Sequence, residues 1–109
     1  MTFSTATNAA VIQRIEVTGQ ELVVFLSDGR SVHVPLAWYP RLANSLPSDR
    51  GVHQLIGRGQ GIHWPEIDED ISLENILQGQ ASGESDQSLA RWQDWYSRKI
   101  AARTNTARG

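Results

Sequence analysis

Short apolar runs separated by polar turns dominate the first third of the chain. In residues 12–17 the apolar Ile15 and Val17 lie two apart, residues 31–34 alternate between polar and apolar positions, and residues 21–26 form the largely apolar run ELVVFL. A period of two, with many β-branched residues, is typical of strands, and a continuous apolar run indicates a strand covered on both faces. The pattern therefore predicts three strands, of which the second is central.

Turn-forming residues connect these strands. Thr18-Gly19-Gln20 separates the first strand from the second, and Asp28-Gly29 separates the second from the third. Asp-Gly between two apolar runs is a strong hairpin signal, because a type I′ turn needs positive φ at both central positions. We expect an antiparallel meander with a type I′ turn, whose apolar face needs a cover from the rest of the chain.

The middle of the chain predicts shorter elements. In order, we expect a helix at residues 40–45, one helical turn at 48–50, extended segments at 53–56 and 62–64, an acidic loop from Glu66 to Asp70, and a helix at 73–78. Either Asp70 or Ser72 can cap the last helix, and Gly79 stands where a helix typically ends.

A single long helix is predicted for residues 86–103. An apolar stripe recurs at helical spacing along it, formed by Leu89, Trp92, Tyr96 and Ile100. Such a helix is marginal alone in water, so the stripe must find an apolar surface. The pattern leaves open whether that surface belongs to the same chain, to a second copy in a homodimer, or to a foreign partner.

The fold class expected from these elements is α+β: a three-stranded antiparallel meander with short helices, an additional strand region and a C-terminal helix. The predicted organisation is a flexible N-terminus (1–10), an α+β core domain (11–79), a linker (80–85), an amphipathic helix (86–103) and a frayed tail (104–109).

Composition narrows the class of protein. The chain has 109 residues, the size of one small domain, and no cysteine, which excludes disulfides, zinc ribbons and thiolate nucleophiles. No stretch approaches the ~20 apolar residues of a membrane span, and no basic segment precedes an apolar run at the N-terminus. We therefore expect a cytoplasmic protein without a membrane partner.

Charge is unevenly distributed. Residues 1–80 hold five arginines and nine acidic residues, a net charge of −4, and residues 81–109 hold five basic and three acidic residues, a net charge of +2. The acidic part indicates a basic protein partner, through complementary steering. The small basic surplus of the C-terminal part does not favour a nucleic-acid partner.

Two motifs invite a chemical interpretation. Gly57 to Gly61 contains three glycines but lacks the Gly-Lys-Ser/Thr ending of a phosphate loop, and a turn between strands is the simpler interpretation. His63 with the acidic loop from Glu66 to Asp70 lacks the spacing of a calcium loop. We therefore expect no enzyme, catalytic residue, metal site or cofactor, and keep a small-ligand or metal-binding domain using His63 and this loop as the alternative.

Three segments together carry a family resemblance: LSDGR at 26–30, VPLAWYPRL at 34–42 and GIHWPEIDEDIS at 61–72. In order and spacing they resemble the small bacterial proteins of domain-of-unknown-function family 2442, over about residues 11–79. The resemblance implies a compact α+β domain with a meander and short helices, and it brings no activity, cofactor or catalytic residue. Some relatives carry a following helix-turn-helix, whereas this tail predicts one helix, which speaks against direct DNA binding.

The resemblance also implies a type of partner, because such proteins are often encoded beside another small protein and a toxin–antitoxin pairing has been suspected. We therefore expect a non-enzymatic interaction module, an antitoxin-like partner of a small protein, with a transcription regulator as the runner-up. The expected partner-binding residues include aromatic side chains taken to be exposed near Trp38 and Trp64. The full set is Trp38, Tyr39, Arg41, His63, Trp64, Asp68, Glu69, Asp70, Trp92 and Trp95.

Overall fold

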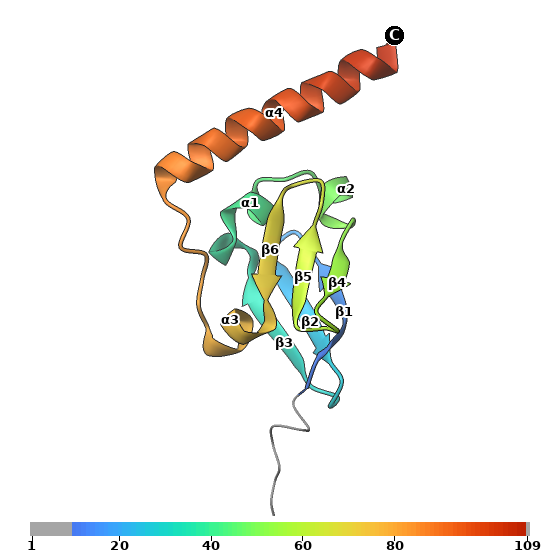
Figure 1. The fold of residues 1–109 in the computed structure, drawn as a ribbon, viewed down its shortest axis with the longest axis vertical. Coiled ribbons are helices and arrows are strands. Elements are labelled where there is room, and N and C mark those ends of the chain that lie inside the picture. The colour runs from blue at the N-terminus through green and yellow to red at the C-terminus, as the bar shows by residue number, and fades with distance from the viewer. Residues whose placement is uncertain (1–9, 109) are drawn as a thin grey trace, which may run out of the picture.

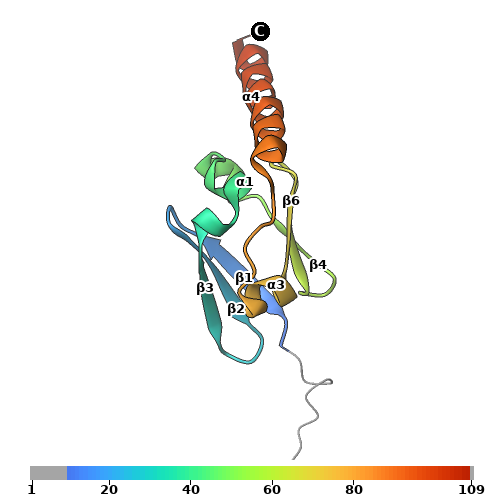
Figure 2. The same ribbon diagram turned by 90° about the vertical axis from the view of Figure 1, so that its left-hand side faces the viewer.

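Two three-stranded antiparallel sheets form the body of the protein. The computed structural model describes residues 10–108, with side chains to Arg103, so the predicted N-terminus apart from Ala10 lies outside the described residues. The first sheet contains β1 (Ile12–Val17), β2 (Glu21–Leu26) and β3 (Ser31–Pro35), and the second contains β4 (Gln54–Ile56), β5 (Gly61–Trp64) and β6 (Glu69–Ser72). The sheets lie in two layers (Figures 1 and 2). The α+β prediction is confirmed.

The β2–β3 turn differs from the predicted type I′ turn. The amide of Leu26 donates to the carbonyl of Arg30 at 2.8 Å, so three residues form the loop. φ is positive at Gly29 (94°) but not at Asp28, and the Asp28 carboxylate instead accepts the Arg30 amide at 3.0 Å. The prediction of a type I′ turn is therefore wrong, although the hairpin and the requirement for glycine at position 29 are correct.

The second sheet contains a strand that the sequence pattern did not predict. Trp64 pairs with Glu69 and His63 pairs with Asp70, so both acidic residues lie in β6 rather than in a loop. The loop consists only of residues 65–68, and Asp68 adopts φ 54° there. The sequence pattern did not predict this strand because Ile71 is the one residue of β6 that is both apolar and buried.

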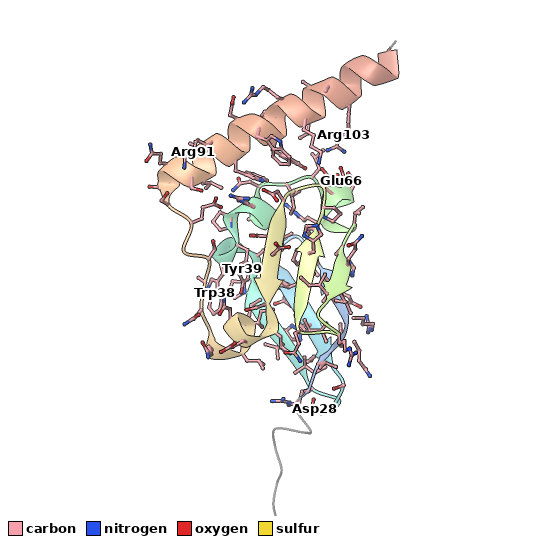
Figure 3. All side chains as sticks on the ribbon, viewed as in Figure 1. Asp28, Trp38, Tyr39, Glu66, Arg91 and Arg103 are labelled. Atoms are coloured by element: carbon pink, nitrogen blue, oxygen red, sulfur yellow. The ribbon has the colours of Figure 1, made fainter. Side chains whose placement is uncertain are left out.

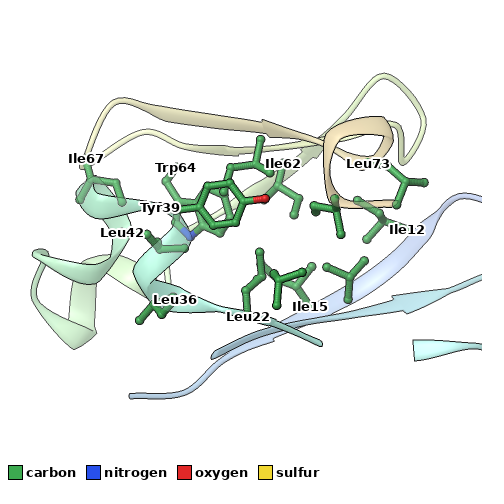
Figure 4. Packing of buried hydrophobic residues seen from close by; sticks show 14 of the residues in the cluster. Ile12, Ile15, Leu22, Leu36, Tyr39, Leu42, Ile62, Trp64, Ile67 and Leu73 are labelled. Atoms are coloured by element: carbon green, nitrogen blue, oxygen red, sulfur yellow. The ribbon is translucent and has the colours of Figure 1, made fainter. Parts of the chain in front are cut away.

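The hydrophobic core lies between the sheets (Figure 4). Leu22 and Val24 of β2 oppose Ile62 and Trp64 of β5, and all four are fully buried. The indole of Trp64 donates to the carbonyl of Arg50 at 3.0 Å, which satisfies its only polar group in the interior. The prediction of an exposed aromatic at position 64 is therefore wrong.

Short helices close the ends of this layer pair. They are the 3₁₀ turn η1 (Leu36–Trp38), α1 (Pro40–Ala43), α2 (Pro47–Arg50) and α3 (Leu73–Gln78). Proline occupies the first helical position in both α1 and α2, so Pro47 begins a helix. In α3, Ser72 accepts the Asn75 amide at 3.1 Å and Gly79 adopts φ 73°, as the sequence predicted.

A close backbone contact joins the two sheets at the other end. The amide of Ile12 donates to the carbonyl of Gly59 at 2.9 Å. Gly59 has φ 86°, and a Cβ atom there would stand 2.7 Å from the Ile12 carbonyl oxygen. This position requires glycine both for its dihedral angle and for space.

Helix α4 (Asp86–Arg108) crosses the end of the body next to α1 and α2 (Figure 1). It runs past the predicted end at residue 103, so residues 104–108 belong to the helix rather than to the predicted frayed tail, and Gly109 lies outside the described residues. Trp92 and Tyr96 are buried and stack with ring centroids 4.9 Å apart. Within the described part of the chain, no helix is long and apolar enough to cross a membrane.

Candidate functional site

Polar contacts fix α4 on the body of its own chain. Asp49 of α2, which is 3% exposed, accepts hydrogen bonds from the hydroxyl of Tyr96 and from the guanidinium of Arg103. The Arg103 hydrogen bonds hold the pKa of Asp49 below its ordinary value. The Trp92 indole donates to the Ile67 carbonyl at 2.7 Å, and Lys99 pairs with Glu66 at 3.2 Å. Figure 3 shows Glu66 and Arg103 where α4 meets the body. Trp92 and Tyr96 of the apolar stripe are therefore buried in cis, and Leu89 and Ile100 are partly buried against the same core.

Arg41 of α1 links the predicted linker to the β5–β6 loop. Its Nε and Nη2 atoms donate to Glu84 at 2.9 and 2.7 Å, and its Nη1 atom donates to the Asp68 carbonyl at 2.8 Å. The Glu84 side chain is 8% exposed and also accepts from Ser88 at 2.7 Å. The hydrogen bonds from Arg41 lower the pKa of Glu84.

The linker is held along its length. The amide of Ser82 donates to the carbonyl of Trp38 at 2.9 Å, and the hydroxyl of Tyr39 donates to the carbonyl of Gln80 at 3.5 Å. Residues 80–85 contain no helix or strand, as predicted, but these contacts and the Arg41–Glu84 pair place them beside the body.

A polar hollow of about 220 Å³ separates the linker from β6. Its lining includes Tyr39, Glu69, Asp70 and linker residues 80–83. A continuation of about 280 Å³ is lined by Arg41, Asp68, Glu69, Asp70, Ser82 and Glu84. We call these two together the Glu69 hollow.

Glu69 is the unusual group in the Glu69 hollow. Its carboxylate accepts the Asp70 amide at 3.1 Å. Burial raises the pKa of Glu69 to about 7, and the negative charges of Glu84 and Asp70 act in the same direction, against the Asp70 hydrogen bond and the Arg41 charge. Burial and the Glu69 charge also raise the pKa of Tyr39. The hollow therefore contains a carboxyl group that titrates near neutral pH.

A second hollow, of about 230 Å³, adjoins the first along α4. It is lined by Arg41, Asp68, Ser88, Arg91, Trp92 and Trp95, and we call it the α4 groove. Trp95 is 40% exposed and has the Lys99 ammonium 5.0 Å from its ring. The Arg91 side chain is exposed and forms no hydrogen bond or ion pair with any described residue.

Seven of the ten predicted partner-binding residues line these connected hollows: Tyr39, Arg41, Asp68, Glu69, Asp70, Trp92 and Trp95. Trp38 touches the linker through its carbonyl group. Trp64 lies in the core, and His63 pairs with Asp70 across the second sheet at 2.5 Å. Sequence reasoning missed Glu84, Ser82 and Arg91, because nothing in the local pattern connects a small polar linker with α1.

No group of three or more His, Cys, Asp or Glu residues is arranged to hold a metal ion in residues 10–108. His63 has one carboxylate neighbour, and the Gly57–Gly61 segment forms the β4–β5 turn, as the simpler interpretation predicted.

Comparisons with known proteins agree with this architecture. No curated protein matches the chain. A crystal structure of a protein of unknown function from Rhodospirillum rubrum has a TM-score of 0.62 at 20% identity, covering 71% of this chain and 95% of the other. A solution structure of an uncharacterised protein from Chromobacterium violaceum has a TM-score of 0.61 at 16% identity, covering 78% of each chain. These two likenesses show the fold alone.

The family comparison covers more than half of the chain. The model for "Protein of unknown function (DUF2442)" matches residues 12–82, which include both sheets, the short helices and the beginning of the linker. This range agrees with the resemblance noted in the sequence and extends slightly beyond it. The chain belongs to this family of proteins of unknown function, DUF2442.

Proposed function

We propose that the protein is a non-enzymatic interaction module whose Glu69 hollow receives a cationic side chain of a protein partner. One observation carries the proposal: Glu69 lies half-buried in a polar hollow with no cation among the described residues hydrogen-bonded to it. The nearby guanidinium of Arg41 directs its hydrogen bonds to Glu84 and Asp68 instead. A partner's lysine or arginine would supply the missing positive charge.

The energetics of Glu69 support a binding role over a purely structural one. A raised pKa means that the ionised side chain opposes folding at neutral pH. An inward-pointing carboxylate that caps the Asp70 amide also protects the free edge of β6, which is a structural explanation for an acidic residue. Glutamine would accept the same hydrogen bond without the cost of ionisation, so edge protection alone does not account for the charge.

The charge of −4 over residues 1–80 favours a basic protein. An antitoxin-like pairing with a small basic protein fits this chemistry. A DNA-binding regulator has less support, since within the described residues a single helix follows the linker and residues 81–109 carry a basic surplus of only two charges.

The test is recovery of a partner by the full chain purified from its native host. Wild type is compared with Glu69→Gln, which keeps side-chain size and the hydrogen bond to Asp70, and with the control Glu74→Gln on the exposed face of α3. We expect a protein partner, either an untagged second copy of the chain or a foreign basic protein, to be retained by wild type and by the control, and its recovery to fall at least about tenfold with Glu69→Gln. Equal recovery by all three proteins would contradict the proposal.

A further inference from the structure

The Glu69 hollow and the α4 groove are contiguous and opposite in character. Arg41 and Asp68 line both of them. Glu69 lies on one side of Arg41 and Asp68, and no cationic side chain among the described residues donates a hydrogen bond to it. Arg91 lies on the other side, and its side chain has no anionic partner among the described residues. Figure 3 shows Arg91 near the start of α4 and Tyr39 below it, on the side of the molecule along which the linker runs.

A surface with adjacent positive and negative regions is complementary to itself. Rotation by 180° about an axis between the two regions exchanges them, so each region of one copy meets the opposite region of the other. The axis implied here passes close to Arg41 and Asp68. The Asp68 side chain is 75% exposed and only 3.4 Å from Arg41, so the same alternation of charge continues at the axis.

We infer that the cation entering the Glu69 hollow is Arg91 of a second copy of this chain, in a two-fold dimer that also covers Trp95. This inference rests on the proposed function and names the partner of the same site. Tryptophan and arginine are among the residues most enriched at the positions that dominate binding energy in protein interfaces. Trp95 and Arg91 provide both types beside one hollow.

The charge pattern of α4 argues against the simpler dimer in which two α4 helices pair with each other. An antiparallel pair centred at Trp95 brings Arg91 near Arg98 and Lys99 of the other copy and offers it no free carboxylate, because Asp94 already accepts from Arg98. Trp92 and Tyr96, the two largest side chains of the stripe that would drive helix pairing, are already buried in cis, and Leu89 and Ile100 are partly buried there. The acidic hollow of the second copy is therefore the complementary surface for Arg91.

Protonation of Glu69 would weaken this dimer. The charged or titratable groups around the carboxyl group are Tyr39 before α1, Arg41 on α1, Asp68 in the β5–β6 loop, Asp70 on β6 with His63 of β5 beside it, and Glu84 on the linker. Arg41 and Glu84 neutralise each other, and Asp70 pairs with His63. Burial raises the pKa of Glu69 to about 7 in the single chain, so protonation of Glu69 competes with the ion pair to Arg91 and the dimer weakens progressively as the pH falls below about 7.

The test uses charge reversal and measurement of molar mass by sedimentation equilibrium. The full-length variants are Arg91→Glu, Glu69→Arg, and the control Arg58→Glu at the exposed tip of the β4–β5 turn. We expect wild type and the control to be dimers at about 100 μM and each site variant to be a monomer. An equimolar mixture of the two site variants should restore the dimer. In the mixed dimer the two reversed side chains attract each other at one contact, and the unchanged Arg91 and Glu69 attract each other at the other.

Three outcomes would overturn the inference: a monomeric wild type, a dimer that survives both reversals, or a mixture that stays monomeric although circular dichroism shows both variants folded. Arg91 is exposed, so its reversal remains informative even where Glu69→Arg fails to fold. A monomeric wild type that still retains a foreign basic protein through Glu69 would remove only the second copy as partner. If neither dimer formation nor the recovery of a foreign protein depends on Glu69, the proposed function is wrong as well.

Discussion

Replacement of Glu69 by glutamine tests the physical basis of the site. The change removes the charge but keeps the side-chain size and the oxygen that accepts the Asp70 amide. We expect the variant to be more stable than wild type at pH 8 and equally stable near pH 4.5. The comparison is made in the Arg91→Glu background, so that no second copy neutralises the carboxylate.

The direction of this stability difference follows from how many protons the folded and unfolded states bind. The Glu69 carboxyl group has a pKa of about 7 in the folded chain, against an ordinary value of 4.5. Between these values the folded state binds more protons than the unfolded state, so the free energy of unfolding falls as the pH rises from about 4.5 to about 7. For a carboxylate fully shielded from solvent, this pKa shift corresponds to a loss of about 3 kcal/mol in the free energy of unfolding at pH 8. Glu69 is partly exposed, so we expect Glu69→Gln to raise the free energy of unfolding by about 1–2 kcal/mol.

Urea denaturation at pH 4.5, 6 and 8 measures the difference between the two proteins. Glu74→Gln, on the exposed face of α3, provides a control whose difference from the same background should not vary across this pH range. A Glu69→Gln protein that is no more stable at pH 8, or whose difference from its background is the same at every pH, would refute the reasoning. In that case the carboxylate is solvated well enough to ionise freely, and the argument for a cationic partner loses its energetic support.

Three further predictions concern the fold. Asp49→Ala should lower the free energy of unfolding by about 2–4 kcal/mol in urea at pH 7, because it leaves the hydroxyl of Tyr96 and its neighbour Arg103 without their acceptor; an unchanged midpoint would show that this anchor of α4 contributes nothing. Gly59→Ala should cost about 2 kcal/mol or more through positive φ and the clash with the Ile12 carbonyl, whereas Gly83→Ala, with nothing within 4 Å, should be nearly neutral in the same thermal melts. Truncation after Gly79 should leave a folded two-sheet body that is about 3–6 kcal/mol less stable and binds a hydrophobic dye, since two large aromatic side chains of α4 no longer cover it; equal stability of the two chains would show that α4 is dispensable.

Several features of the protein could be predicted because their signals are local. The hairpin around Gly29 follows from a turn residue between two apolar runs, and α3 follows from the hydroxyl of Ser72 and the glycine at position 79. The stripe of α4 identified its buried face, including Trp92, from helical spacing alone. Each of these interactions joins residues only a few positions apart, so composition and spacing determine them.

Other features needed contacts between distant segments. The sequence placed Glu69 in a loop, because strand β6 has little apolar character of its own and forms through backbone pairing with β5. It also placed Trp64 at the surface, although the indole is enclosed once the two sheets meet and its N–H finds the Arg50 carbonyl.

The candidate site shows the same division. Its residues Tyr39, Arg41, Glu69 and Trp95 could be picked out by residue type and by an acidic first part of the chain, which composition alone reveals. Only the tertiary structure decided that the linker returns along β6 and that Glu84 accepts the hydrogen bonds of Arg41. Glu69 is therefore half-buried without a cationic hydrogen-bond partner among the described residues. Burial and the pairing of charges depend on which segments meet in space, and a carboxylate acquires a pKa near neutrality only through those non-local neighbours.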